Sequence, residues 1–269
     1  MWFLRKLFRR QMQAATGEGM SPVVAESIAA LKAQAQPCLR LVPGGDGRSR
    51  LGGTPEMAGV WPRYEGRPLS CVAQLDLAEV QAAGGPDWLP ANGRLLFLYE
   101  LEHGSWGLDV KDTGSAVVIH ETGPPIAATE PDDLPSDAKL PAYPIGFAPS
   151  PSYPSGERVA IDWDHLNTAS ADTLEEALVS LAPTAPAHQI GGYPSPVQSD
   201  GMEAECENIA RRSGHGGGDP ADWRLLLQLD TDEDVGMMWY DVGALYFWIR
   251  EQDARAGDFS KVWTILQSN

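Results

Sequence analysis

The sequence predicts an α+β fold: a β-rich, mixed sheet structure with an internal duplication, plus helices at the N-terminus. Three signals recur in one order along the 269 residues: an aliphatic residue with Gly-Gly-x-Pro, then Gln-Leu-Asp, then Gly-x-Leu-x-Phe. In the first copy the three signals begin at Leu51, Gln74 and Gly93. In the second copy they begin at Ile190, Gln228 and Gly243. Two copies of so long a unit predict two similar parts packed together, because solenoids usually need three or more repeats.

Short apolar runs bounded by turn formers predict the strands. Residues 225–229 and 243–249 are apolar throughout or nearly so, which is typical of strands buried on both faces. Similar runs predict further strands at residues 38–42, 68–75, 95–99, 116–120 and 261–267. Gly-Gly-x-Pro predicts a turn, since glycine permits a positive φ and proline fixes φ.

Capping residues predict the helices. A helix over 21–35 would begin with Ser21 as N-cap and Pro22 as the first helical residue. Asp76 is expected to cap a short helix through Val80, with Glu79 as its capping-box partner. Two further helices are expected, one ending at residue 181 after a capping box at residues 172–175 or 173–176, and one over 202–212.

Residues 121–160 hold nine of the 22 prolines, so we expect an extended connector with one edge strand near residues 143–147. This connector separates the two repeats. The predicted organisation is an N-terminal helical extension over residues 1–35 and one domain over 36–269. Within the domain, repeat one covers about 36–125, the connector and a helix about 126–185, and repeat two about 186–269.

The charge balance restricts the partners. A net charge of −17 argues against a nucleic-acid partner, because no basic field exists to displace phosphate counterions. It favours a cationic protein or peptide partner instead. The three cysteines are odd in number and form no C-x-x-C pair, which favours a reducing, cytoplasmic compartment. The spacing of cysteines and histidines predicts no metal site, and no cofactor motif is present.

Residues 1–10 contain four basic residues and no acid, with apolar residues on one helical face. Such a segment either lies on an anionic membrane surface or forms a helix or extension beside the domain. No stretch approaches the roughly 20 apolar residues that cross a bilayer.

Several motifs together resemble one family. They are Ser49-Arg50-Leu51-Gly52-Gly53-x-Pro55, Ala73-Gln74-Leu75-Asp76-Leu77, His188-Gln189-Ile190-Gly191-Gly192-Tyr193-Pro194 and Gly236-Met237-Met238-Trp239. In this order they resemble the YwqG-like family, a bacterial family of unknown function, over roughly residues 36–269. The resemblance implies a mixed α/β fold rich in antiparallel sheet, with an internal duplication, and no established activity. Relatives near contact-dependent toxin genes imply an immunity-like or partner-binding role.

The candidate binding residues are His188, Gln189, Tyr193, Trp239 and Asp241. His188 beside a glycine turn is either a general base or ligand, with Asp241 or Glu203 as its partner, or a histidine bonded to backbone. Trp239 to Asp241 form a binding ledge for a ring or peptide if exposed, and belong to the core if buried.

Asp76 and Asp230 occupy matching repeat positions. They either meet as a carboxylate pair or each cap a turn, and capping is the simpler interpretation. Two functions follow for the chain. The first is a non-enzymatic interaction protein that binds a protein or peptide between the repeats. The second is a hydrolase or small-ligand enzyme that uses His188 with a nearby carboxylate.

Overall fold

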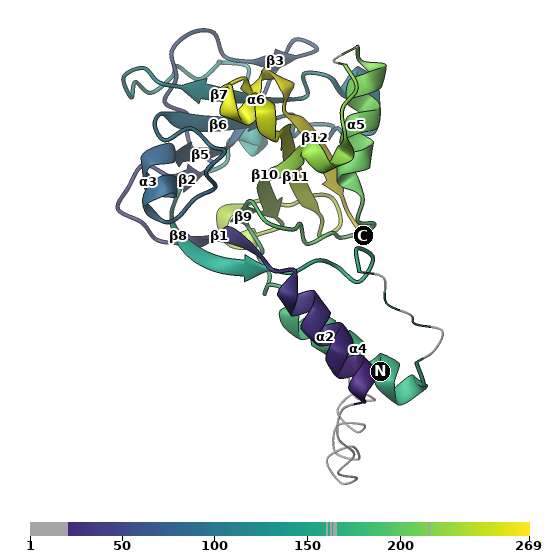
Figure 1. Cartoon of the computed structure of the whole chain (residues 1–269). Helices are drawn as coiled ribbons and strands as arrows, with labels where there is room; N and C mark the ends of the chain where they lie inside the picture. The colour runs from purple at the N-terminus through teal and green to yellow at the C-terminus, as the bar shows by residue number, and fades with distance from the viewer. Residues whose placement is uncertain (1–20, 160, 162, 164–165, 215) are drawn as a thin grey trace.

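The computed structural model describes residues 21–159, 161, 163, 166–214 and 216–269 (Figure 1). One ten-stranded sheet dominates it, in the order β12-β11-β10-β9-β1-β8-β2-β5-β6-β7. The β-rich α+β class is therefore confirmed. Every strand pairing among the described residues is antiparallel, so the sheet is not a mixed one. The amphipathic segment expected over residues 1–10 lies outside the described residues.

The sheet strands are β1 (Gln36–Pro43), β2 (Arg50–Leu51), β5 (Ser70–Asp76), β6 (Arg94–Tyr99), β7 (Ala116–Glu121), β8 (Tyr143–Ser152), β9 (Gln189–Ile190), β10 (Trp223–Asp230), β11 (Ala244–Arg250) and β12 (Trp263–Gln267). The strands β3 (Arg63–Tyr64) and β4 (Arg67–Pro68) form a separate hairpin. The helices are α2 (Pro22–Ala33), α3 (Leu77–Ala82), α4 (Thr168–Leu181), α5 (Met202–Arg212) and α6 (Glu251–Arg255).

The sheet has two flanks of like construction around β1 and β8. One flank runs β2-β5-β6-β7 and the other β9-β10-β11-β12. Asp76 lies opposite Arg94 in the first flank, and Asp230 lies opposite Ala244 in the second. The register also shifts at matching places, after Cys71 in β5 and after Leu225 in β10. The two flanks therefore share strand order, register and irregularity.

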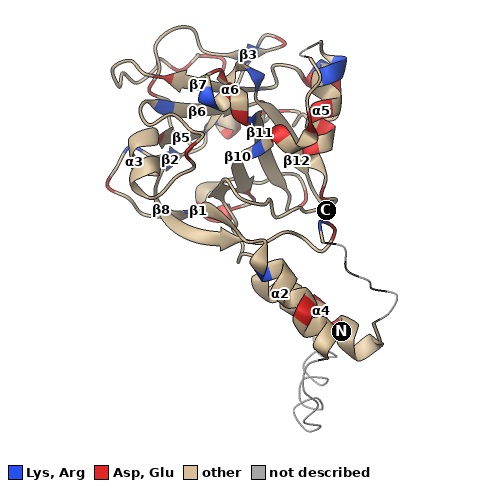
Figure 2. Cartoon of the chain, in the orientation of Figure 1, with Lys and Arg blue, Asp and Glu red and all other residues tan. Residues whose placement is uncertain are grey.

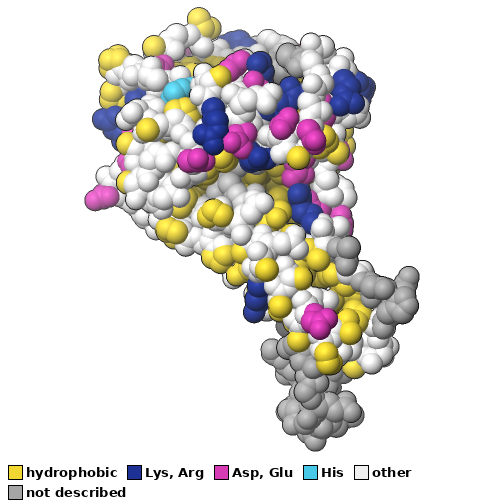
Figure 3. Space-filling view, viewed as in Figure 1, with side chains coloured by type: hydrophobic (Ala, Val, Ile, Leu, Met, Phe, Trp, Pro, Cys, Tyr) yellow, Lys and Arg dark blue, Asp and Glu magenta, His cyan; other side chains and the backbone are white. Residues whose placement is uncertain are grey.

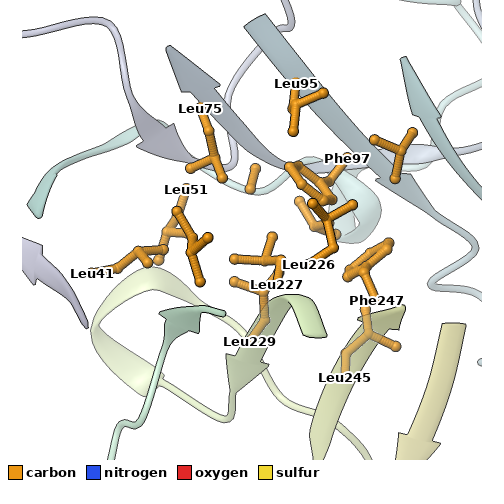
Figure 4. Packing of buried hydrophobic residues seen from close by; sticks show 14 of the residues in the cluster. Leu41, Leu51, Leu75, Leu95, Phe97, Leu226, Leu227, Leu229, Leu245 and Phe247 are labelled. Carbon is orange, nitrogen blue, oxygen red and sulfur yellow. The ribbon is translucent and has the colours of Figure 1, made fainter. Parts of the chain in front are cut away.

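The flanks meet in one hydrophobic core. Phe97 of β6 and Phe247 of β11 occupy matching positions, and their rings pack edge to face with centroids 5.1 Å apart (Figure 4). Leucines of β5, β6, β10 and β11 surround them. Buried aliphatic and aromatic side chains of this kind supply most of the stability of a domain.

A second, smaller core lies beneath α5. Met202, Cys206 and Ile209 of the helix are buried, as its apolar spacing predicts, and the first two pack with Trp223 and Trp248 of the sheet. Its acidic residues and its basic C-terminal end are visible in Figure 2, and their order suits the helix dipole. Cys38, Cys71 and Cys206 are all buried free thiols.

The strand β8 is longer and more central than the predicted edge strand. It pairs with the whole length of β1, from Gln36 opposite Ser152 to Pro43 opposite Ile145. On its other side, β2 pairs only with Tyr143 and Pro144. The Ile145 N–H points to this second side, where it donates to the Ser49 carbonyl. Prolines 149 and 151 share that orientation beyond the end of β2, so they remove no ladder hydrogen bond.

The helices α2 and α4 form a pair that projects from the sheet (Figure 1). Val24, Leu31 and Leu174 are fully buried between them, in a cluster separate from the main core. Hydrophobic side chains also reach the visible surface of the pair (Figure 3). Val23 of α2 and Val179 of α4 are exposed. The expected capping box at residues 172–176 was wrong, because α4 begins at Thr168 and Asn167 caps it through the Ser170 N–H.

Candidate functional site

The two Gly-Gly-x-Pro turns make the same contacts with the two Gln-Leu-Asp motifs. In the first flank the Gln74 Oε1 accepts from the Glu56 N–H at 2.9 Å. In the second the Gln228 Oε1 accepts from the Ser195 N–H, also at 2.9 Å. The amide nitrogens match too, since Gln74 donates to the Arg48 carbonyl and Gln228 to that of Ala187. These glutamines are buried because they satisfy backbone groups that water cannot reach.

His188 takes part in this matched pattern. In the first flank the Ser49 Oγ accepts a hydrogen bond from the Asp76 N–H at 2.9 Å. In the second flank the His188 Nδ1 accepts from the Asp230 N–H at 3.0 Å. Serine and histidine thus perform one structural task at equivalent positions.

The other ring nitrogen of His188 is also occupied. Its Nε2 lies 3.1 Å from the Asp232 Oδ2. Because Nδ1 accepts a hydrogen bond, Nε2 carries the proton and donates it to that carboxylate. Burial lowers the pKa of His188, and the hydrogen bond and charge of Asp232 only partly oppose the effect. The imidazole is therefore neutral at pH 7, with no free nitrogen for proton abstraction.

The partners expected for His188 lie elsewhere. Asp241 is exposed and bonds through its backbone to Ser268. Glu203 accepts two hydrogen bonds of 2.8 Å from Arg158. The expectation of Asp241 or Glu203 was thus wrong, and Asp232 is the partner. Asp232 belongs to an acidic run, residues 230–234, at the end of β10, and this run was the signal in the sequence.

Asp76 and Asp230 each bond to backbone N–H groups. Asp76 caps α3 by accepting from Ala78 and Glu79, as predicted. The expected capping box with Glu79 was wrong, because the Asp76 N–H donates to Ser49 and the Glu79 carboxylate accepts from the Arg48 and Ser49 N–H groups. Asp230 accepts from Ala187 at 2.8 Å and from Thr231 at 2.9 Å. Both carboxylates therefore have the capping role, which is the simpler of the two interpretations.

Gln189 and Tyr193 lie on either side of the second glycine turn. Gln189 is fully buried and donates to the carbonyls of Gly191 and Tyr193. The Tyr193 ring lies under the Arg158 guanidinium, 5.6 Å from its centroid. It lines a pocket of about 740 Å³ together with Trp88 and other aromatic side chains. Of these two candidates, only Tyr193 reaches a surface that a ligand can occupy.

Trp239 belongs to the core, the second of the two alternatives for this residue. It is 3% exposed, its indole N–H donates to the Asp230 carbonyl at 3.0 Å, and its ring packs on Tyr99. Tyr240 and Asp241, next in the chain, are exposed. The tryptophan therefore belongs to the core, and the residues beside it provide the exposed surface.

That surface consists of Trp106, Met238, Tyr240 and Val242, and we call it the aromatic surface. These four side chains are 37%, 52%, 48% and 55% exposed. The rings of Trp106 and Tyr240 stack with centroids 4.8 Å apart and planes inclined by 21°. The Tyr240 hydroxyl donates to the carbonyls of His103 and Gly104, at 2.6 and 3.0 Å. Two loops distant in sequence are thereby joined at one apolar face.

The backbone of the aromatic surface is strained. Tyr240 has a φ of 51° and Val242 a φ of 53°, in the left-handed region that glycine normally occupies. A β-branched residue there is a genuine outlier. Non-glycine residues in such regions cost about 1–3 kcal/mol each and concentrate at functional sites. Sequence reasoning missed this feature, since nothing in Tyr-Asp-Val predicts a left-handed turn.

The surroundings of the aromatic surface are acidic. Asp241, between Tyr240 and Val242, is exposed. On the facing loop, Glu102 is exposed and lies 3.5 Å from the Arg67 guanidinium, and Glu100 is buried where it accepts from the backbone N–H groups of Glu102 and His103. Glu100, Glu102 and His103 bring metal-ligand atoms together, but Glu100 is already held by these backbone groups.

The comparisons with known proteins identify the family of the chain. No helix among the described residues is long and apolar enough to cross a membrane. No curated protein matches the chain. The family model of a domain of unknown function, DUF1963, matches residues 49–268, which is well over half of the sequence. The chain therefore belongs to the DUF1963 family of domains of unknown function.

Proposed function

We propose that this chain is a non-enzymatic binding protein, and that its aromatic surface receives an apolar segment of a basic protein partner. The observation that carries the proposal is the left-handed backbone of Tyr240 and Val242 at an exposed apolar face. Folding alone would favour glycine at both positions. Strained non-glycine residues concentrate at functional sites, and the exposed parts of these two side chains are available to a partner.

The composition of the aromatic surface suits a protein interface. Tyrosine and tryptophan dominate binding hot spots, because a rigid amphipathic ring buries a large area at little entropic cost. Methionine adapts to irregular partners. Trp106 and Tyr240 are already stacked and hydrogen-bonded, so little conformational freedom is lost on binding.

The charge around the aromatic surface favours a basic partner. Asp241 on one loop and Glu102 on the other are exposed, Glu102 in an ion pair with Arg67, and the whole chain carries −17. Complementary charge accelerates association and excludes acidic competitors. An apolar residue flanked by lysine or arginine therefore describes the expected partner segment.

The alternative, a hydrolase that uses His188, receives less support. A general base needs a nitrogen that can accept a proton from the substrate or nucleophile. Both nitrogens of His188 are engaged, and its position matches that of Ser49 in the other flank. The matched geometry supports a structural role for the imidazole.

A peptide-display selection tests the proposal. A random peptide library would be selected on the full chain and on its Trp106→Ser variant. We expect peptides that combine an aromatic or aliphatic residue with lysine or arginine, whose affinity falls with added salt and is lost in the variant. Trp163→Ser is the matched control, since Trp163 is 37% exposed like Trp106 but lies far from it in sequence. Selected peptides that bind both variants alike would refute the assignment.

We also propose that the chain arose by internal duplication and is YwqG-like. The shared strand order and register, the matched glutamine contacts and the paired Ser49 and His188 support this origin. A further pair supports it, because the Ala58 N–H donates to the Glu121 side chain and the Val197 N–H to that of Gln267. The proposed domain covers 36–269, with a cytoplasmic, immunity-like role.

A further inference from the structure

A second site lies at the end of β1, away from the aromatic surface. Arg40 lines a pocket of about 650 Å³ between β1, β8 and the chain that leaves α4. Tyr143, Tyr153, Asp232 and Asp234 also line it. Such a volume falls within the range of small-ligand pockets.

Arg40 is a partly buried arginine without a carboxylate partner, as is Arg50, whose guanidinium donates to the Arg48 and Thr54 carbonyls and to Gln74. The Arg40 guanidinium donates to the neutral Gln189 Oε1, and no carboxylate of the described residues makes an ion pair with it. Burial lowers the pKa of Arg40, which is the sign of a cation with too little compensation. An acidic protein has many carboxylates with which to pair this charge, and none is placed there.

Arg158 provides the contrast. It is also partly buried, but it bonds to Asp200 and to both carboxylate oxygens of Glu203. Burial acts to lower the pKa of Arg158, but these hydrogen bonds and charges outweigh it, and the pKa is raised. The charge of Arg158 is thus balanced by carboxylates of the chain, whereas the charge of Arg40 is available to an anionic ligand.

The pocket is also lined by two carboxylates, Asp232 and Asp234. Asp232 accepts from His188 and from the Asp234 N–H, and the Asp234 side chain is exposed. Because His188 is neutral, it does not cancel the charge of Asp232. The pocket therefore presents one cation and two anions to a ligand, and a simple anion such as phosphate would meet repulsion as well as attraction.

We propose that this pocket binds a small zwitterion, a molecule with a carboxylate at one end and an amine at the other. The carboxylate pairs with the planar guanidinium of Arg40, which offers two parallel N–H donors. The amine faces Asp232 and Asp234. This site is separate from the aromatic surface and does not depend on the function proposed there.

Thermal melting of the full chain with a panel of amino acids tests the proposal. The panel contains glycine, 4-aminobutyrate, 6-aminohexanoate and lysine, which vary the spacing of the two charges. Butyrate, butylamine and inorganic phosphate are the single-charge controls. We expect at least one amino acid to raise the melting temperature and the single-charge compounds to leave it unchanged, since a ligand stabilises the state it binds.

Three variants assign the binding to the pocket. Arg40→Gln is expected to weaken the affinity at least about tenfold, since hydrogen bonds to charged groups contribute strongly. Asp234→Asn is expected to weaken it less, and Arg48→Gln, at an exposed arginine nearby in sequence, should not change it. Stabilisation of the wild type by no amino acid, by phosphate alone, or equally in Arg40→Gln would overturn the proposal.

A second measurement separates a binding role of Arg40 from a structural one. Without ligand, Arg40→Gln keeps an amide donor for Gln189 and removes an uncompensated charge, so its melting temperature should stay near that of the wild type. Arg158→Gln breaks a satisfied ion pair and should melt lower. A larger loss in Arg40→Gln than in Arg158→Gln would make Arg40 structural and would also overturn the proposal.

Discussion

The role of His188 can be tested by replacing it with serine, the residue at the equivalent position of the other flank. In His188→Ser, the hydroxyl should accept from the Asp230 N–H as the Ser49 Oγ accepts from the Asp76 N–H at 2.9 Å. In His188→Ala, that N–H loses its acceptor. A structural histidine predicts that serine retains more stability than alanine, whereas a catalytic one predicts no such order.

The magnitude follows from the contacts that are lost. His188 is 4% exposed and makes two hydrogen bonds, with the Asp230 N–H and with Asp232. Each contributes about 1 kcal/mol, and a buried donor without an acceptor costs about 1–3 kcal/mol. We therefore expect His188→Ala to lower the free energy of unfolding by about 3 kcal/mol. His188→Ser should recover about 1 kcal/mol of this loss.

Urea denaturation followed by tryptophan fluorescence measures both variants, with the midpoint compared at constant slope. An alanine variant as stable as the wild type would contradict the assigned hydrogen bonds. So would a serine variant no more stable than the alanine variant, since it would break the proposed equivalence with Ser49.

The pH dependence supplies a second signature of the same residue. Because burial lowers the folded-state pKa of His188 below its ordinary 6.5, the unfolded chain binds more protons as the pH falls through that value. The stability that His188 contributes is therefore complete above pH 6.5 and declines toward the folded-state pKa. The advantage of the wild type over His188→Ser should shrink in this window, and a constant difference would argue against a buried, neutral imidazole.

Two further substitutions test the strained backbone at Val242 and the buried ion pair between Glu207 and Arg250. Val242→Gly should stabilise the chain by about 1 kcal/mol by removing a left-handed β-branched residue, whereas Val60→Gly, at another exposed valine, should not stabilise it, as thermal melting would show. Burial acts to raise the pKa of Glu207, but the Gly218 N–H and the Arg250 guanidinium lower it to about 2. Glu207→Gln should lower the free energy of unfolding by about 3 kcal/mol, because it breaks the buried ion pair with Arg250. The wild type should lose stability as the pH falls from 4.5 to 2, and this loss should be smaller in Glu207→Gln.

The recurring motifs predicted the two flanks well. Gln-Leu-Asp and Gly-x-Leu-x-Phe mark β5 and β6 in one flank and β10 and β11 in the other, because apolar runs bounded by turn formers leave few other arrangements. The cap at Asp76 was also predicted correctly, since a local hydrogen bond depends on residues two or three positions apart.

Long-range arrangement was harder to predict. The prolines of β8 predicted an edge strand. The strand β8 lies inside the sheet because β2 is short and pairs with only two of its residues. The predicted start of α4 was wrong because the sequence offers several N-cap residues, Asn167 and the later acidic ones. A helix that begins at Thr168, after Asn167, packs on α2.

The candidate residues were only partly located by sequence. His188 and Gln189 prove to be buried and bonded within the fold, and Trp239 belongs to the core. The exposed residue beside it, Tyr240, depends on a left-handed turn that no local propensity predicts. Arg40 gave no signal, because an unpaired charge is visible only when its surroundings are known.

Binding of a display-selected peptide to Tyr240→Ser and to His188→Ser tests the central claim most directly, with calorimetry at fixed salt as the readout. The account predicts that Tyr240→Ser weakens the affinity at least about tenfold, as for a hot-spot aromatic residue, while His188→Ser binds like the wild type. Loss of binding in His188→Ser with full binding in Tyr240→Ser would contradict it and place the site at the imidazole.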